Sequence, residues 1–186
     1  PDGIHVELGS GGGFFKEMLP GVIRSEVQRM GQVDAVFSAE ALPFREGAIA
    51  AMYLLDVLHH IPDPARFFEE TLRCLAPGGR VIMIEPYNTA WGRWVWKHLH
   101  HEPFDPRAGW KLPPGGPLSG ANGAVPWIIF KRDRALFEQQ FSLLRIVRLQ
   151  PMMPGTYLFS GGVSMRSFLP GSAYGLVRTL ERALGP

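Results

Sequence analysis

Short apolar runs alternate with amphipathic stretches through the first half of the chain. Runs of strand length occupy residues 4–8, 22–27, 35–37, 49–55 and 80–85. Between the last two lies an amphipathic stretch over 64–75, in which Pro64 suits a first helical turn and Asp63 suits its cap. Strands that alternate with helices at this spacing predict βαβ units, because parallel neighbours need crossover connections.

The second half of the chain has a less regular pattern. Helical spacing recurs over 91–101, 132–141 and 173–184, and strand-like runs lie at 143–149 and 157–163. We therefore predict one α/β domain over 1–186 with a Rossmann-like, mainly parallel, doubly wound sheet of about six or seven strands and helices on both faces. Residues 103–126 are rich in Pro and Gly, which indicates an insertion.

Composition narrows the class of protein. The chain is 46% hydrophobic and 19% charged, without an apolar run long enough to span a membrane, so we expect a soluble globular protein. Its formal charge is +2 and its basic residues are scattered, so nucleic acid is not an expected partner. The single cysteine, Cys74, excludes an internal disulfide framework and favours the cytoplasm. No signal-peptide pattern follows Pro1, and because proline is not an initiator we expect residues upstream.

A glycine-rich turn follows the first strand. Gly9, Gly11 and Gly13 allow the backbone to turn sharply and approach a ligand, and the acid Glu7 precedes them. Such a turn also occurs in dinucleotide enzymes and as plain packing. The run lacks the Gly-Lys-Ser/Thr ending of an NTPase phosphate loop, and its spacing differs from the dinucleotide fingerprint. Glu26 closes the second strand, where an acid can accept both ribose hydroxyls or lie solvated in a loop.

Four segments together resemble a known enzyme family. They are Glu-Leu-Gly-Ser-Gly-Gly-Gly at 7–13, Ala-Leu-Pro-Phe at 41–44, Asp-Val-Leu-His-His-Ile at 56–61 and Arg-Cys-Leu-Ala-Pro-Gly-Gly at 73–79. In this order and spacing they resemble class I S-adenosylmethionine-dependent methyltransferases of the ubiquinone and small-molecule methylating group, also called methyltransferase type 11. The resemblance covers about half of the chain and implies S-adenosylmethionine as the cofactor.

The resemblance also implies which residues hold the cofactor. The glycine loop and its acid would face the methionine part, Glu26 the ribose, and residues 39–42 the adenine, whereas the end of the fourth strand would line the sulfonium pocket. The cofactor-binding candidates are Glu7, Gly9, Ser10, Gly11, Gly13, Glu26, Ala39, Glu40, Ala41, Leu42, Leu55 and Asp56. The sequence departs from the family at Ser38, where relatives often carry Asp, and at 49–50, where they often carry Phe-Asp. It also begins without the helix that precedes the first strand in relatives.

Candidates for catalysis and for binding the methyl acceptor follow the later strands. His59, His60 and Asp56 are candidates for the general base, although a His after a buried strand is also a common core residue. Tyr87, Trp91 and Trp110 are candidates for binding the methyl acceptor, with core packing as the alternative explanation of the tryptophans.

A second histidine group invites interpretation as a metal site. His98, His100 and His101 lie close to Glu102, but their spacing is not that of a known zinc helix. We therefore expect no metal and interpret these residues as a solvated or substrate-facing helix end.

The sequence thus predicts an S-adenosylmethionine-dependent methyltransferase with a small-molecule substrate, in which residues 103–126 close over the acceptor. The methylated atom stays open between oxygen, nitrogen and carbon, and a homodimer is one candidate assembly. Two alternatives remain. One is an inactive methyltransferase-like binding or regulatory protein, and the other is a Rossmann-type NAD(P)-dependent oxidoreductase.

Overall fold

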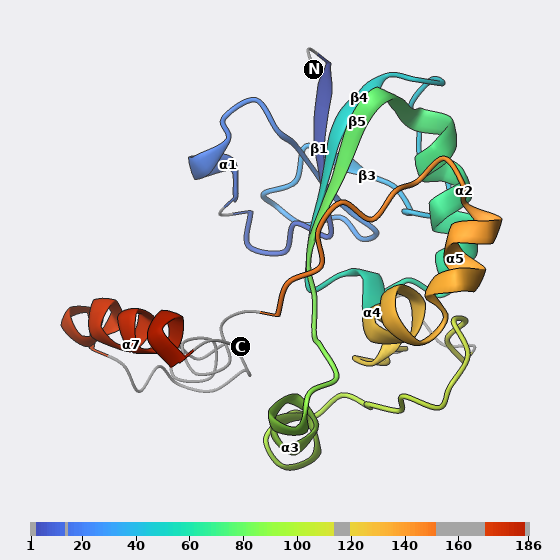
Figure 1. The fold of residues 1–186 in the computed structure, drawn as a ribbon. Coiled ribbons are helices and arrows are strands. Elements are labelled where there is room, and N and C mark those ends of the chain that lie inside the picture. Colours follow the sequence, from blue (N-terminus) through green and yellow to red (C-terminus); the bar gives the residue numbers. More distant parts are fainter. Residues whose placement is uncertain (1–2, 14, 114–119, 152–169, 185–186) are drawn as a thin grey trace.

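Five parallel strands form one twisted sheet (Figure 1). The computed structural model describes residues 3–13, 15–113, 120–151 and 170–184. The strands are β1 (Ile4–Leu8), β2 (Ile23–Glu26), β3 (Ala35–Val36), β4 (Ile49–Leu55) and β5 (Leu75–Ile84). Their order is β3-β2-β1-β4-β5, and every pairing is parallel. The predicted Rossmann-like α/β class is confirmed, with the chain reversing its direction of winding between β1 and β4.

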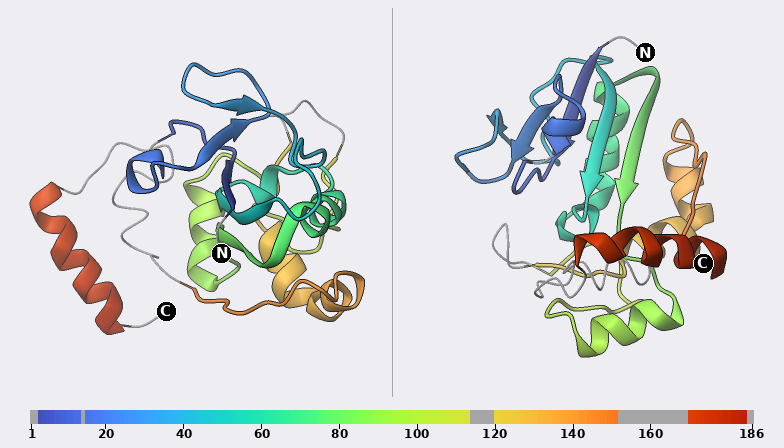
Figure 2. Two further views of the ribbon diagram at one scale, coloured as in Figure 1. Left: turned by 90° about the horizontal axis from the view of Figure 1, so that it is seen from above. Right: turned by 90° about the vertical axis from the view of Figure 1, so that its left-hand side faces the viewer.

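Helices flank the sheet and continue beyond it. The helical elements are α1 (Phe15–Met18), η1 (Leu58–His60), α2 (Pro64–Cys74), α3 (Ala90–His98), α4 (Val125–Trp127), the π-helical turn η2 (Ile128–Arg132), α5 (Arg134–Gln140) and α7 (Gly171–Leu184). Figure 1 shows α1 on one side of the sheet and α2 with α5 on the other. In Figure 2 the arrowheads of β4 and β5 point toward α3 and α4, so these helices lie beyond the carboxyl edge.

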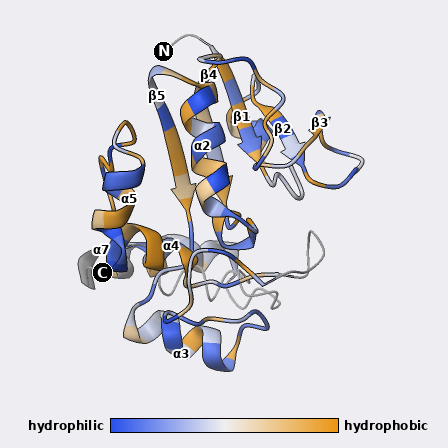
Figure 3. Cartoon of the chain, turned by 90° about the vertical axis from the view of Figure 1, so that its right-hand side faces the viewer, coloured by the Kyte–Doolittle hydropathy of each residue, from blue (hydrophilic) through white to orange (hydrophobic). Residues whose placement is uncertain are grey.

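The hydrophobic core lies between the sheet and α2. Strand side chains such as Val6 and Leu54 are fully buried, and Phe68 of α2 packs on Phe137 and Phe141 at ring-centroid distances of 5.0 and 5.3 Å. Figure 3 shows hydrophobic colour along the lower part of β5 and on α4, and both kinds of colour on α2. An amphipathic α2 therefore covers one face of the sheet and leaves its polar side to solvent.

Local signals explain where α2 begins and ends. The Asp63 carboxylate accepts a hydrogen bond of 3.4 Å from the backbone N–H of Arg66, and Pro64 occupies the first helical position. The helix ends at Cys74, and β5 starts at once, earlier than the predicted 80–85. Its register with β4 shifts beyond Leu75, which leaves a bulge that contains Gly78 at φ 75°.

Several predicted elements differ from the structure. The helix expected at 132–141 is divided between η2 and α5. The strand predicted at 143–149 is wrong, since this segment forms no strand and Leu143 and Val147 are 83% and 95% exposed. The strand predicted at 157–163 lies outside the described residues. The described sheet therefore has five strands instead of the predicted six or seven.

Among the helices that the structure describes, none combines the length and apolar character needed to cross a lipid bilayer.

Candidate functional site

The carboxyl edge of the sheet brings together segments that are distant in sequence. β1 lies between β2 and β4, so the glycine loop after β1 neighbours Glu26 at the end of β2 and Asp56 after β4. In open α/β sheets ligands bind in this crevice, where the direction of winding changes. The structure thus brings most of the predicted cofactor-binding residues to one edge.

Glu26 holds the glycine loop directly. Its Oε1 atom accepts a 3.0 Å hydrogen bond from the backbone N–H of Gly11, and its Oε2 atom accepts one of 3.1 Å from Val27. Ser10 adds a second tie between the strands, because its N–H donates to the carbonyl of Ser25 at 2.9 Å. Each carboxylate oxygen can accept more than one hydrogen bond, so Glu26 retains capacity for a ligand hydroxyl.

Gly9 is required by both conformation and space. Its φ is 63°, in the left-handed region, and a Cβ atom there would lie 2.6 Å from Cγ2 of Val57. Gly9 therefore lets the loop after β1 approach the loop after β4 more closely than any side chain would allow.

The substitution Gly9→Ala should lower the free energy of unfolding by about 2–4 kcal/mol, through left-handed strain and the clash with Val57. Gly12→Ala is the matched control, because a Cβ atom there meets nothing within 4 Å and its φ is not positive. Urea denaturation of both variants checks this, and equal midpoints would show that the loop relaxes freely.

Glu7 is the buried acid of the site. The residue is 2% exposed, and none of the described residues provides a hydrogen-bond partner for its Oε2 atom. Burial raises the pKa of this carboxyl group. A buried carboxylate oxygen without a donor is costly, and an ammonium group from a ligand would satisfy it.

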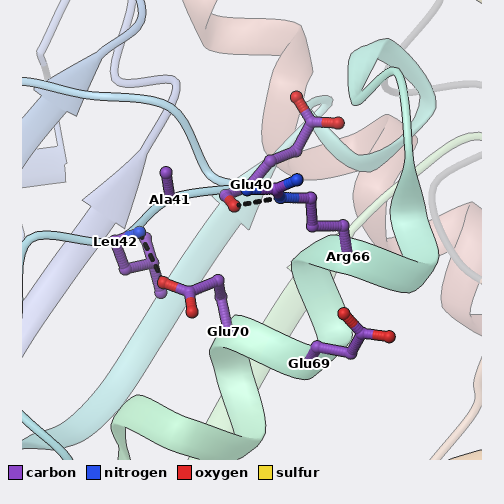
Figure 4. A pocket seen from close by; sticks show the side chains of 6 residues that line it. All are labelled: Glu40, Ala41, Leu42, Arg66, Glu69 and Glu70. Atoms are coloured by element: carbon purple, nitrogen blue, oxygen red, sulfur yellow. Dashed lines mark hydrogen bonds between the residues drawn. The ribbon is translucent and has the colours of Figure 1, made fainter.

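Residues 39–42 follow β3 and are held by α2 (Figure 4). The N–H of Leu42 donates to Glu70 at 2.8 Å, and the Arg66 side chain donates to the carbonyl of Glu40 at 3.0 Å. A depression of about 320 Å³ lies here, lined by Glu40, Ala41, Leu42, Arg66, Glu69 and Glu70. Its lining includes no glycine-loop residue, so it is a surface hollow beside α2 and is separate from the Glu7 side of the crevice. Ser38 accepts a 3.1 Å hydrogen bond from the N–H of Glu40, so this departure from the family pattern supports the local turn.

Glu85, after β5, anchors the loop that follows β4. Its Oε1 atom accepts hydrogen bonds from the backbone N–H groups of Val57 and Leu58 at 2.9 and 2.7 Å. Its Oε2 atom lies 2.8 Å from Nδ1 of His59, which places a proton on that nitrogen. His59 is therefore oriented by a buried carboxylate, with Nε2 pointing away from it.

Glu102, from the segment after α3, contacts both histidines. Its carboxylate oxygens lie 3.4 Å from Nε2 of His59 and 3.4 Å from Nε2 of His60. The segment is pinned by the buried Asn122, whose N–H donates to the carbonyl of His59 and whose side chain pairs with the backbone of Asp105. Part of the predicted insertion thus contributes directly to the site.

The three predicted catalytic residues differ in charge. Burial alone would lower the pKa of His59, but the carboxylates of Glu102 and Glu85 outweigh it and raise the pKa to about 9. Burial, followed by the charge of His59, lowers the pKa of His60. Desolvation by the surrounding protein and repulsion from Glu85 raise the pKa of Asp56 to about 6. The Asp56 side chain nevertheless keeps a surface exposed to solvent, although protein atoms lie close around it. At neutral pH His59 is therefore protonated and positively charged, whereas Asp56 is mostly ionised and His60 is neutral, so Asp56 or His60 can accept a proton.

The comparison with protein families matches the same part of the chain. Residues 6–83 match the family described as "Methyltransferase domain", which spans β1 to β5 and includes the glycine loop, Glu26 and the His59–His60 loop. Over these residues the chain is therefore similar to methyltransferases, as the resemblance of its sequence motifs implies.

Individual relatives of the methyltransferase segment are partial matches. The chain is 40% identical over 48 residues to tocopherol O-methyltransferase of Arabidopsis thaliana, an overlap that covers 25% of this chain and 14% of the plant protein. Among solved structures, a methyltransferase from Thermotoga maritima, described as a possible histamine N-methyltransferase, is 28% identical, with a TM-score of 0.44 over 53% of this chain and 52% of its own. A methyltransferase from Aquifex aeolicus is 14% identical, with a TM-score of 0.49 over 80% of this chain and 76% of its own. The chain thus matches only a small part of its curated relative and about half of the Thermotoga protein.

The three candidates for binding the methyl acceptor lie apart from one another. Tyr87 is half-buried after β5, and Trp91 is 42% exposed on α3, where it stacks on Trp94 at 5.3 Å. The indole N–H of Trp110 donates to Asp133 at 2.9 Å, and its ring stacks on Phe141 of the core. Packing accounts for Trp110, and Tyr87 is the candidate nearest in sequence to Glu85.

Two residues of the site were not predicted as functional. Glu85 was noted only as the end of a strand, and Asn122 lies within the glycine-rich insertion. A signal for Glu85 exists, because an acid that ends a buried strand lies at the ligand edge of a parallel sheet. No local pattern marks Asn122.

Proposed function

We propose that this protein is an S-adenosylmethionine-dependent methyltransferase that acts on a small molecule. The observation that carries the proposal is the buried Glu7 carboxylate, whose Oε2 atom lacks a partner among the described residues beside a glycine loop closed by Glu26. The chemistry of these groups fits the ligand, because an ammonium group suits the first acid and ribose hydroxyls suit the second. Location in the cytoplasm, with one free buried cysteine, and a homodimer remain parts of the prediction.

The cofactor, when bound, supplies a methyl group on a sulfonium for an in-line displacement. The chain's own residues then have three tasks. Glu7 binds the ammonium group, Glu26 binds the ribose while keeping the loop closed, and Asp56 accepts a proton from an acceptor that is not yet nucleophilic. Closure of residues 103–126 over the acceptor stays a prediction.

Isothermal calorimetry with S-adenosylmethionine, S-adenosylhomocysteine and NAD tests the proposal. We expect both adenosyl compounds to bind and NAD not to bind, and binding of NAD alone would favour the oxidoreductase alternative. Binding of the adenosyl compounds without turnover across a broad panel of acceptors would favour an inactive binding protein.

The variant Glu26→Ala should weaken binding of S-adenosylhomocysteine by roughly 1–3 kcal/mol, because it removes an acceptor for the ribose and frees the loop. The exposed carboxylate Glu46 provides the matched control, and Glu46→Ala should bind as the wild type does. Calorimetric titration of both variants measures the difference, and an unchanged dissociation constant for Glu26→Ala would remove this role.

A further inference from the structure

The group formed by His59, His60 and Glu102 has a geometry that also suits a metal ion. Glu102 lies between the two imidazoles, at 3.4 Å from Nε2 of each. These separations exceed the usual length of an N–H···O hydrogen bond, which is about 2.7–3.2 Å. The two separations are close to the edge of a zinc tetrahedron, because two ligands at about 2.0–2.1 Å from the ion lie about 3.3 Å apart.

The surroundings of His59 match those of a metal-binding histidine. Its Nδ1 atom lies 2.8 Å from the Glu85 carboxylate, so the ring can keep its Nδ1 proton there while a metal ion displaces the proton on Nε2 and takes that nitrogen as a ligand. Glu85 is itself held by two backbone N–H groups, and its side chain is 6% exposed. Metal-binding histidines commonly donate their other ring N–H to a carboxylate in this way, and that partner holds the ring in place.

A third observation concerns the number and placement of the ligands. One ligand atom from each of His59, His60 and Glu102 lies within 4.8 Å of the others, so a modest movement of side chains would close them on one ion. His59 is buried and the other two are half-buried, so the group is partly accessible to solvent. Two imidazoles and one carboxylate with an open position form the ligand set of catalytic zinc sites.

We infer that His59, His60 and Glu102 bind a divalent transition-metal ion of the zinc type at the carboxyl edge of the sheet. Two nitrogen ligands favour zinc over magnesium and calcium, which prefer oxygen. The earlier expectation of no metal rested on the spacing of His98, His100 and His101. The fold instead pairs Glu102 with two histidines that lie more than forty positions before it. This inference does not depend on the proposed methyl transfer.

Calorimetry with ZnCl₂, on the full chain without a histidine tag and without cofactor, tests the site. We expect one zinc ion per chain, and at least about tenfold weaker binding for Glu102→Gln and for His60→Ala. His98→Ala is the matched control, because His98 is exposed on the same part of the chain and packs on Trp94. It should bind zinc as the wild type does.

Two further measurements keep the inference falsifiable if a variant folds poorly. Cobalt(II) added to the wild type should give the intense visible absorption of a four-coordinate ion, and MgCl₂ should not compete with it. The inference is overturned by an absence of zinc binding, by equal affinity for magnesium, or by folded Glu102→Gln and His60→Ala proteins that bind zinc as tightly as the His98→Ala protein.

Discussion

Replacing Glu85 by alanine is expected to lower the free energy of unfolding by roughly 3–5 kcal/mol, because one carboxylate serves three buried or half-buried donors. The N–H groups of Val57 and Leu58 and the Nδ1 atom of His59 would all lose their acceptor. His59 would also be left charged without its closest counter-ion. The loss should therefore exceed that of an ordinary surface carboxylate by several-fold.

Urea denaturation at neutral pH measures this loss, with the slope of the unfolding transition checked for constancy. Glu69→Ala is the matched control, since Glu69 is an exposed carboxylate on α2 and its removal should change stability by less than about 0.5 kcal/mol. Glu85→Gln should lie between the two variants, because the amide oxygen can still accept from the backbone. If Glu85→Ala unfolds at the same urea concentration as Glu69→Ala, Glu85 does not anchor this loop.

The elements that sequence predicts well are those with local causes. Helix α2 is an example, since its cap at Asp63, its first-turn Pro64 and its apolar face all belong to one short segment. The helix can therefore be predicted without knowledge of the tertiary structure. The glycine loop is similar, because Gly9, Gly11 and Gly13 permit the positive φ that a sharp turn requires, and all three have it. The apolar runs in turn predicted the five described strands, although β5 begins earlier than expected.

The strand predicted at 143–149 shows where local reasoning fails. The segment has β-favouring residues, and Ile146 packs against the core, but Val147 is 95% exposed. A strand requires a neighbouring strand to accept its hydrogen bonds, and no described strand pairs with this segment. A high β-propensity therefore shows only that a segment can form a strand, and not that a neighbouring strand is present to pair with it.

The histidine group shows the same limit for the functional site. His59 and His60 were predicted as candidates from their place after β4, and that placement at the carboxyl edge is confirmed by the topology. Glu102 reaches the two histidines because Asn122 ties the segment that carries Glu102 to η1. The N–H of Asn122 donates to the carbonyl of His59, and its side chain accepts from the N–H of Asp105. Contacts of this kind depend on the path of an irregular segment, which has no periodic signal in the sequence.

Glu7→Gln is expected to change binding and stability in opposite directions. The variant loses the charge that would pair with an ammonium group, so affinity for S-adenosylhomocysteine should fall about tenfold to a hundredfold. The cofactor-free protein should keep its stability or gain up to about 1 kcal/mol, because a buried carboxylate oxygen without a described partner is replaced by a neutral group. A residue that only supports the fold would instead lose stability on substitution.

The dependence on pH follows from the direction of the pKa shift. Burial raises the pKa of Glu7 above its ordinary value of 4.5, so the folded state binds this proton more tightly than the unfolded state does. The cost of burying the charge is absent below the ordinary value, develops as pH rises, and is complete above the raised pKa. The wild type should therefore lose stability relative to Glu7→Gln between these two values, and the two proteins should be similar in acid.

Urea denaturation at about pH 4 and about pH 7, together with calorimetry at neutral pH, separates these effects. Glu17→Gln controls for the loss of one negative charge near the glycine loop, because Glu17 is exposed on α1. It should leave both stability and affinity unchanged. A Glu7→Gln protein that is less stable at neutral pH and binds as tightly as the wild type would contradict the assignment. The Glu7 carboxylate would then belong to the core, and the ammonium group of the cofactor would need another partner.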